Sequence, residues 1–258
     1  MKNSFKYIVS TAFAMALVLF VACGKESVAN PTSGRVRFYN AVSDAPAAGM
    51  DLVIDGAITN LRNWLTPSSP LADSTFKYRA GFPVVTDSVY FYMTEGTHNV
   101  KLTSLVGGTT TALNLDMTVA AGGTYTVFAT DTLSKVSAVI STDVIGAPVS
   151  KKASFRFAHM IPDGPAVDIA RVRGTDTTLI FTNITYKTVT PFVSVDTSVG
   201  TTGPFKTDYL VRPAGTKTSV TAANWTAAVF ANGRVYTLVA TGLLGKSTVN
   251  KSLLTNAR

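Results

Sequence analysis

The chain is poor in the side chains that enzymes most often use for chemistry. Its 258 residues include one cysteine, two histidines and two tryptophans, and only 15% of them are charged. A single cysteine excludes a disulfide within the chain. No H-E-x-x-H, G-x-S-x-G or G-x-G-x-x-G pattern occurs, so metalloprotease, serine-hydrolase and dinucleotide-binding signatures are absent from the sequence. We therefore expect a protein that is not an enzyme and has no catalytic residue, metal or cofactor.

Positive charge is in excess but is not clustered. The 23 lysines and arginines outnumber the 15 acidic residues, for a net charge of +8. Nucleic-acid-binding proteins usually gather basic residues on one face or in runs, whereas the longest basic run here is Lys151-Lys152. We expect a solvated basic surface and no nucleic-acid partner. Weak attraction to anionic glycans or lipid head groups is the alternative.

Residues 1–22 have the composition of an export signal. Lys2 and Lys6 precede an uncharged segment that runs to Ala22 and ends in small residues. This segment is shorter than the roughly 20 apolar residues that a membrane-spanning helix needs. Because a cysteine is the first residue after the predicted cut, Phe20-Val21-Ala22-Cys23 resembles the lipobox of bacterial lipoproteins, with phenylalanine in place of the usual leucine.

The lipobox resemblance implies that Cys23 is lipidated, with a diacylglyceryl thioether on its thiol and an acyl chain on the new N-terminus. Several chains are what stable membrane anchoring requires. Residues 23–33 are polar and turn-forming, which predicts a flexible tether. Lys25-Glu26 weakly resembles the surface-export signal of Bacteroidetes-type lipoproteins. We expect a lipid anchor at the outer membrane or cell surface, with a periplasm-facing anchor as the alternative.

The rest of the chain has the pattern of a tandem duplication. Four groups of residues recur in the same order: Arg37-Phe38 as Arg156-Phe157, Phe76-Lys77 as Tyr186-Lys187, Gly96-Thr97 as Gly215-Thr216, and 125–130 as 236–241. We interpret residues 34–143 and 153–258 as two units, with 144–152 as the linker between them. Each unit is long enough to form a core of its own.

Both units have the periodicity of β strands. Val89, Phe91 and Met93 alternate with Tyr90 and Tyr92, the period-2 pattern of a strand with two different faces. The YTVFAT and YTLVAT segments combine β-branched and aromatic residues, which suit a pleated, half-buried surface. Short turn signals recur between such segments. We therefore predict an all-β fold of two tandem antiparallel β-sandwich domains after a cleaved signal.

Two sets of residues are candidate sites. The first set, predicted to stabilise turns, is Asp44, Pro46, Asp51, Asp163, Pro165 and Asp168. An aspartate two residues before a proline can cap a turn through nearby backbone amides. Each pair of aspartates is also a candidate for a hard cation, but calcium takes six or more oxygen ligands, and each unit shows only two carboxylates. We therefore predict a structural role and no metal.

The second set is a speculative binding platform formed by Tyr90 and Tyr92. Exposed tyrosines on one strand face offer flat aromatic surfaces to a sugar ring or to a protein partner. The alternative is that these tyrosines cover the second sheet of their own sandwich.

The opening of each unit resembles a known family. The segments RVRFYNAVSDAPAAGMDLVIDG and SFRFAHMIPDGPAVDIARVRG are similar to the bacterial domain of unknown function 4397, in which an Arg-hydrophobic strand precedes an Asp-x-Pro turn and an Asp-hydrophobic strand. The later YTVFAT-like strand of that family also occurs twice. The resemblance implies two tandem copies of an immunoglobulin-like or transthyretin-like sandwich, often behind a lipoprotein signal. It implies no activity.

Two hypotheses for the function follow. The first is a lipid-anchored cell-envelope protein that acts as a non-catalytic interaction or adhesion module with an envelope-protein partner. The second is a surface lipoprotein that captures a glycan or another ligand for an uptake system. A hydrolase is a remote alternative, because the two carboxylates of a glycosidase can lie far apart in sequence.

Overall fold

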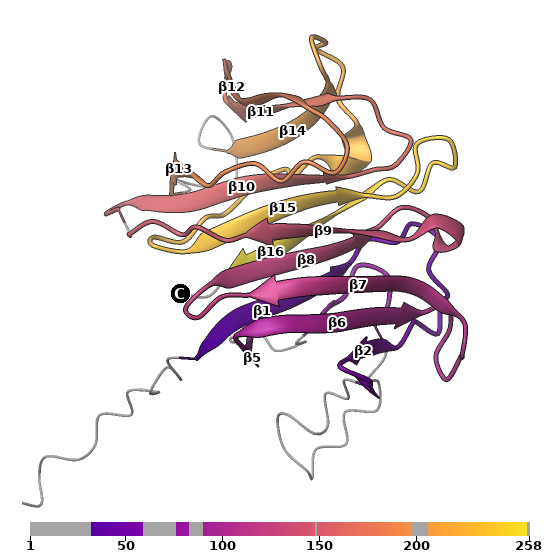
Figure 1. Cartoon of the computed structure of the whole chain (residues 1–258). Helices are drawn as coiled ribbons and strands as arrows, with labels where there is room; N and C mark the ends of the chain where they lie inside the picture. The colour runs from indigo at the N-terminus through magenta and orange to yellow at the C-terminus, as the bar shows by residue number, and fades with distance from the viewer. Residues whose placement is uncertain (1–31, 59–75, 83–89, 148, 198–205, 257–258) are drawn as a thin grey trace, which may run out of the picture. The chain divides into compact units, whose positions relative to one another are not determined.

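The computed structural model describes residues 32–58, 76–82, 90–147, 149–197 and 206–256 (Figure 1). The predicted signal, Cys23 and all but the end of the predicted tether lie outside the described residues. Thr32–Arg258 forms one compact unit. In the described part of the chain, no helix is both long and apolar enough to cross a membrane.

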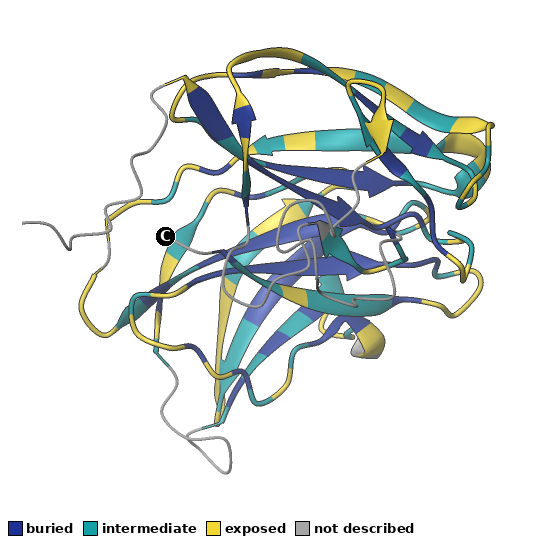
Figure 2. Ribbon diagram, turned by 90° about the horizontal axis from the view of Figure 1, so that it is seen from below, coloured by how far each residue is buried: buried dark blue, intermediate teal, exposed yellow. Residues whose placement is uncertain are grey.

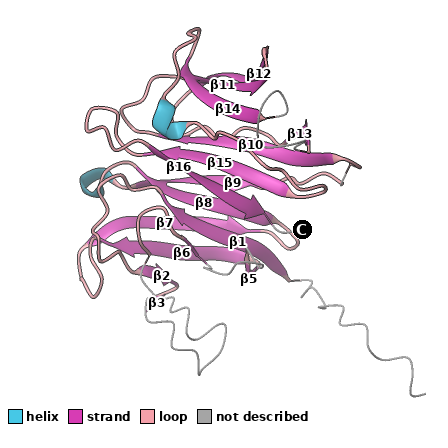
Figure 3. Cartoon of the chain, turned by 180° about the vertical axis from the view of Figure 1, so that it is seen from behind, coloured by secondary structure: helices cyan, strands magenta, loops and turns pink. Residues whose placement is uncertain are grey.

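The protein has an all-β sandwich fold, as the strand periodicity predicts (Figure 3). The N-terminal half contains β1 (Ser33–Asn40), β2 (Leu52–Ile54), β3 (Ala57–Ile58), β4 (Gly81–Phe82), β5 (Phe91–Thr94), β6 (Gly96–Thr103), β7 (Thr111–Val119), β8 (Thr124–Thr130) and β9 (Ser137–Thr142). The C-terminal half contains β10 (Lys152–Met160), β11 (Val167–Arg173), β12 (Asp176–Ile184), β13 (Val193–Asp196), β14 (Thr207–Pro213), β15 (Val235–Thr241) and β16 (Asn250–Asn256). Two short 3-10 turns are η2 (Leu133–Lys135) and η4 (Thr221–Ala223).

Each half consists of an inner and an outer sheet with an apolar core. In the N-terminal half the outer sheet has the order β3-β2-β6-β7, and the inner sheet has the order β4-β1-β8-β9, with β5 also paired to β1. In the C-terminal half the outer sheet is β12-β11-β14 and the inner sheet is β13-β10-β15-β16. The two cores include Phe38, Met50, Val100, Met117 and Val127 in the first half, and Phe155, Phe157, Ile169, Tyr209 and Leu238 in the second.

The first strand of each half pairs in parallel with a strand far along the chain. β1 lies beside β8 with Arg37 opposite Thr126, and β10 lies beside β15 with Arg156 opposite Thr237. On its other side, each of these strands pairs antiparallel with β5 or β13. The residues matched between β1 and β10, and between β8 and β15, therefore occupy the same register in the two halves.

The two inner sheets also pack against each other, so their central strands are buried on both faces (Figures 1 and 2). Along β8, Val127 and Ala129 face the core of their own half, whereas Phe128 joins a third apolar cluster. Its buried members are Tyr39, Ala41, Phe128, Ala158, Met160 and Val239, which come from β1, β8, β10 and β15 and the residue after β1. Full burial of a large apolar side chain contributes roughly 1.5–3 kcal/mol, so this cluster is a substantial part of the contact between the halves.

Contacts between the halves are reciprocal. The Tyr78 hydroxyl donates to Thr241 Oγ1 at 2.9 Å, and the Tyr186 and Thr130 hydroxyls lie 3.2 Å apart. Thr130 ends β8 and Thr241 ends β15. Each half therefore uses the same position to reach the other, which is the arrangement of an isologous, two-fold symmetric interface.

Two of the predicted correspondences are wrong in detail. The Arg79 amide donates to the Asn40 carbonyl at the end of β1, and the Lys187 amide donates to the His159 carbonyl in β10. Arg79, not Lys77, therefore corresponds to Lys187. Both residues have positive φ, 62° and 68°, which identifies the same turn in each half.

The second error concerns glycine. Gly96 begins β6, whereas Gly215 follows the end of β14. Gly107 and Gly215 are the equivalent pair, because the amide of each donates to the aspartate at the start of the second strand of its half, Asp51 just before β2 or Asp168 as the second residue of β11. The loops differ in length between the two halves, so short sequence matches near them pair the wrong residues. The long strands keep the same register in both halves.

Candidate functional site

A buried ion pair lies between the two halves. Nη1 of Arg156 lies 2.7 Å from Oδ1 of Asp143, and their side chains are 2% and 0% exposed. Arg156 comes from β10 and Asp143 directly follows β9, so the pair joins the halves. Nε of Arg156 also donates to Thr237 Oγ1 at 2.9 Å, and Nη1 donates to Ser141 Oγ at 3.0 Å.

Arg37 occupies the equivalent place in the N-terminal half. Its Nη2 donates to Thr126 Oγ1 at 3.2 Å and its Nη1 to the Thr255 carbonyl at 3.3 Å. The guanidinium lies over the Tyr90 ring at 5.1 Å, as that of Arg156 lies over Phe192 at 4.3 Å. Burial lowers the pKa of Arg37. Each of the two buried guanidiniums thus lies over one aromatic ring, and the Asp143 carboxylate pairs directly with that of Arg156.

Tyr90 belongs to this buried cluster, so the prediction that it is part of an exposed platform is wrong. Its hydroxyl donates to Asp143 Oδ2 and accepts from Asn256 Nδ2, each at 2.6 Å. Burial, together with the neighbouring Asp143 carboxylate, raises the pKa of Tyr90 to about 12. Each arginine of the two Arg-Phe pairs has partners in both halves: Arg37 donates to Thr126 and to the Thr255 carbonyl, and Arg156 contacts Thr237 and Asp143.

The first aspartate of each half holds a distant loop. Oδ1 of Asp44 accepts from the Leu133 amide in η2, at 2.5 Å. Oδ1 and Oδ2 of Asp163 accept from the Leu244 and Gly245 amides, both at 2.7 Å. Both loops follow the parallel strand, β8 or β15. These bonds join each carboxylate to a loop about 80–90 residues further along the chain, rather than to its own turn.

The second aspartate of each half also binds backbone amides. Oδ2 of Asp51 accepts from Gly107 at 2.7 Å. In the other half, Oδ1 of Asp168 accepts from Asn183 and Oδ2 from Gly215, both at 2.8 Å. Asp168 is almost fully buried. These carboxylates, which the sequence also offered as candidates for a cation, thus accept from backbone amides, and the described residues contain no cluster of three or more potential metal-binding side chains.

The two prolines of the first set also have local structural roles. The Pro46 carbonyl accepts from the Gly49 amide at 2.8 Å. The Pro165 carbonyl lies 2.9 Å from Nε2 of His159. Because the Ile161 amide donates to Nδ1 of His159, Nε2 carries the hydrogen and the ring is neutral. Burial, which outweighs the bond to Pro165, lowers the pKa of His159.

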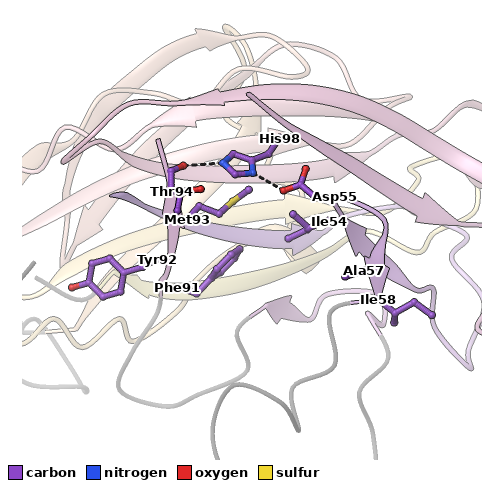
Figure 4. A pocket seen from close by; sticks show the side chains of 9 residues that line it. All are labelled: Ile54, Asp55, Ala57, Ile58, Phe91, Tyr92, Met93, Thr94 and His98. Atoms are coloured by element: carbon purple, nitrogen blue, oxygen red, sulfur yellow. Dashed lines mark hydrogen bonds and ion pairs between the residues drawn. The ribbon is translucent and has the colours of Figure 1, made fainter. Parts of the chain in front are cut away.

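A pocket of about 270 Å³ lies between β3, at the edge of the outer sheet, and β5, in the inner sheet of the N-terminal half (Figure 4). It is lined by Ile54, Asp55, Ala57, Ile58, Phe91, Tyr92, Met93, Thr94 and His98. Figure 4 shows Phe91 between Tyr92 at one end and Ile58 at the other, with His98 and Asp55 along one side. Tyr92 and Ile58 are 50% and 56% exposed. Tyr92, unlike Tyr90, therefore remains a candidate binding residue.

His98 joins two elements at this pocket. Its Nδ1 lies 2.7 Å from Asp55 Oδ2, and its Nε2 lies 2.8 Å from the Thr94 carbonyl. Both partners are acceptors, so both ring nitrogens must donate and the imidazolium form is favoured. Burial opposes this charge, but the bonds to Asp55 and Thr94 outweigh it and raise the pKa of His98. The bond from His98 in turn lowers the pKa of Asp55.

The sequence did not single out His98, Asp55 or Phe91. Asp55-Gly56 has the composition of a hairpin turn, and φ of Asp55 is 51°. The sequence offers a turn at Asp55-Gly56 and one histidine in this half, His98. Only the pairing of β2 with β6 brings the two side chains together. No sequence spacing shows this.

The fold and these contacts define an all-β protein whose halves are sandwiches with matching inner-sheet registers and reciprocal contacts. The model of the family described as a domain of unknown function (DUF4397) matches residues 34–170. That match covers more than half of the chain, and the chain belongs to this family. The match includes the N-terminal half and continues through β10 into β11. No curated protein matches the chain.

Proposed function

We propose that the protein is a lipid-anchored, non-catalytic interaction or adhesion module of the bacterial cell envelope, built from two copies of the family domain. Cys23 carries the lipid and residues 23–33 form the tether. Residues 34–143 and 153–258 are the two copies. The outer membrane or cell surface is the proposed location, with the Bacteroidetes-like lipoprotein signal as its basis.

One observation carries the non-catalytic part of this proposal. The buried side chains of Arg37, Asp143 and Arg156 join the two halves, as the ion pair of Arg156 with Asp143 illustrates. The aspartates at the turns bind backbone amides. This use of charge supports a rigid body that presents its outer sheets and loops, rather than a site that performs acid–base chemistry.

The duplication is supported by the reciprocal contacts of Tyr78 and Tyr186 and by the shared registers of β1 with β10 and β8 with β15. A gene duplication that fuses two copies of a symmetric dimer would produce this internal pseudo-symmetry. The two copies then form one body without depending on protein concentration.

The anchor is tested by metabolic labelling of the full chain with an alkyne fatty acid in a bacterial host. The wild-type chain should be labelled and processed, and Cys23→Ser should accumulate as an unlabelled precursor. Labelling of the variant at the wild-type level would contradict the lipid anchor.

The interaction is tested in the same cells with a photo-crosslinking amino acid at Leu179. This side chain is 51% exposed on β12 of an outer sheet. A discrete adduct with an envelope protein supports the interaction module. Absence of any adduct from exposed positions in both outer sheets contradicts it.

A second function, capture of a glycan or another small ligand, is favoured by the pocket between β3 and β5. That pocket combines apolar walls with a charged pair and lies at the surface, the combination found in small-molecule sites.

A further inference from the structure

We propose that the pocket between β3 and β5 binds one neutral sugar ring, with the apolar face of the ring against Phe91 and its hydroxyl groups on Asp55. The inference rests on the capture function above and specifies its ligand.

The charges in the pocket cancel. The ring nitrogens of His98 lie 2.7 Å from Asp55 Oδ2 and 2.8 Å from the Thr94 carbonyl, two acceptors, so the positively charged imidazolium is favoured when Asp55 is negative. Among the lining residues these two are the ionisable groups of opposite sign, and they are paired at 2.7 Å. A neutral ligand therefore fits the pocket better than an anion or a cation does.

Asp55 retains room for further hydrogen bonds. An ionised carboxylate offers about four acceptor positions. Two of them are used, by His98 Nδ1 on Oδ2 and by the Asn99 amide on Oδ1. The side chain is 52% exposed, so the remaining lone pairs are open to the donor groups of a ligand. Hydroxyl groups at neighbouring ring positions match a carboxylate with two accessible oxygens.

The opposite wall is apolar. Phe91 packs on Phe38 at a ring-centroid distance of 6.0 Å, which fixes the ring within the pocket. Ile54 and Met93 lie beside it (Figure 4). An aromatic ring next to polar acceptors suits a ligand with one C–H face and a polar edge, which is the chemistry of a pyranose. A volume of about 270 Å³ lies just below the range of roughly 300–1,000 Å³ that is typical of small-molecule pockets, so the pocket accommodates a single ring.

The strand edge is not suited to a peptide. Addition of a partner strand to β5 would need its outward carbonyls as acceptors. The Thr94 carbonyl at the end of this strand already accepts from His98 Nε2. A sugar is therefore favoured over a peptide that extends the sheet.

The test uses the two histidines as an internal comparison. The chain from Gly24 onward contains the whole compact unit, and it is prepared with isotopically labelled histidine and titrated with a panel of methyl glycopyranosides. At least one sugar should shift the ring resonances of His98 in a saturable manner and leave those of His159 unchanged. His159 is buried in the other half and serves as the control.

Matched variants locate the site. Phe91→Leu should weaken sugar binding at least tenfold. Phe181→Leu is its control, because Phe181 stacks on Phe155 at 6.1 Å as Phe91 stacks on Phe38. Should Phe91→Leu fail to fold, Ala57→Trp fills the pocket from an exposed position without removing a core side chain.

Three outcomes overturn the inference. The first is the absence of a saturable His98 shift with any sugar. The second is an equal loss of binding in Phe91→Leu and Phe181→Leu. The third is saturation of His98 by short peptides and not by sugars. None of them affects the labelling of Cys23 or the crosslinks from Leu179, so failure of this inference is distinguishable from failure of the proposed interaction module.

Discussion

Asp143 neutralises Arg156 across the contact between the two halves, through a 2.7 Å ion pair that is almost completely hidden from solvent. The carboxylate also accepts from Tyr90 and Thr126 on its second oxygen. In a buried site the removal of one partner leaves the other charge without compensation, which is more destabilising than the loss of an exposed pair. The contact between halves therefore depends strongly on one acidic residue.

Asp143→Asn should reduce the free energy of unfolding by about 3–5 kcal/mol, because Arg156 then stays buried without a counter-charge. Asp196→Asn is the control. Asp196 pairs with Lys152, and their side chains are 52% and 40% exposed, so its loss should change stability by less than about 1 kcal/mol. Urea unfolding followed by tryptophan fluorescence measures both. Equal effects of the two substitutions would contradict the central role of the buried pair.

This contact also marks the limit of the sequence prediction. Period-2 alternation predicted the strands, and the repeat predicted that Arg37 and Arg156 are equivalent, because long strands keep their register. The threonines of β8 and β15 resemble the polar residues of a solvent-facing surface. Thr126 and Thr237 are instead fully buried, since their hydroxyls satisfy the arginines. The sequence does carry one signal for this second buried face. In each half an arginine recurs within an apolar strand, and a threonine recurs in the strand that pairs with it.

The pocket between β3 and β5 is harder still to predict from the sequence. Phe91 and Tyr92 were correctly placed on opposite faces of one strand, but nothing in the sequence shows that Asp55 and His98 meet. Their contact depends on the register of β2 against β6, and register is a property of the whole sheet. The burial of Tyr90 is equally hidden in the sequence, because its hydroxyl contacts Asp143 of its own half and Asn256 of the other half.

The aspartates at the turns provide the second prediction. Asp168→Ala should lower the free energy of unfolding by about 1.5–3 kcal/mol, because the Asn183 and Gly215 amides lose a charged acceptor. Asp51→Ala should have a smaller effect, since the Asp51 carboxylate accepts from Gly107 and is more exposed.

The same samples test the cation alternative. If the carboxylates serve only the fold, millimolar calcium should leave the melting temperature of the wild-type protein unchanged in a calorimetric scan. A rise in melting temperature with calcium that disappears in Asp168→Ala would show that the aspartates bind a cation.

The pKa values of the two histidines should be shifted in opposite directions. The pKa of His98 is raised and that of His159 is lowered from the ordinary 6.5. The stabilising contribution of His98 is fully present below about pH 6.5 and is lost as the pH rises through its higher folded-state pKa. For His159 the unfolded chain binds the proton more readily, so stability rises with pH between the lowered folded-state pKa and about 6.5.

Histidine ring resonances recorded across the pH range measure both values in one sample. In Asp55→Asn the pKa of His98 should fall, because the charged acceptor is removed, while that of His159 stays constant. A pKa of His98 at or below that of His159 in the wild-type protein would contradict the bonding described for the pocket.

The last prediction concerns the reciprocal contacts between the halves. Tyr78 bonds to Thr241 and Tyr186 bonds to Thr130, and both threonines are fully buried. Burial raises the pKa of Tyr186, so its hydroxyl stays protonated. Tyr78→Phe and Tyr186→Phe should each lower the free energy of unfolding by about 0.5–1.5 kcal/mol, the usual contribution of one such bond. Tyr92→Phe, in which the altered ring is half exposed, is the control and should be neutral.

Double-mutant cycles separate this symmetric contact from a general loss of packing. Tyr78→Phe combined with Thr241→Val, and Tyr186→Phe combined with Thr130→Val, should each show a coupling energy above about 0.5 kcal/mol, as residues in direct contact do. The two coupling energies should be similar, because the two pairs occupy equivalent places. Coupling in one pair and additivity in the other would mean that the halves do not meet through a symmetric interface, and the proposal of a fused, duplicated dimer would then lose its main support.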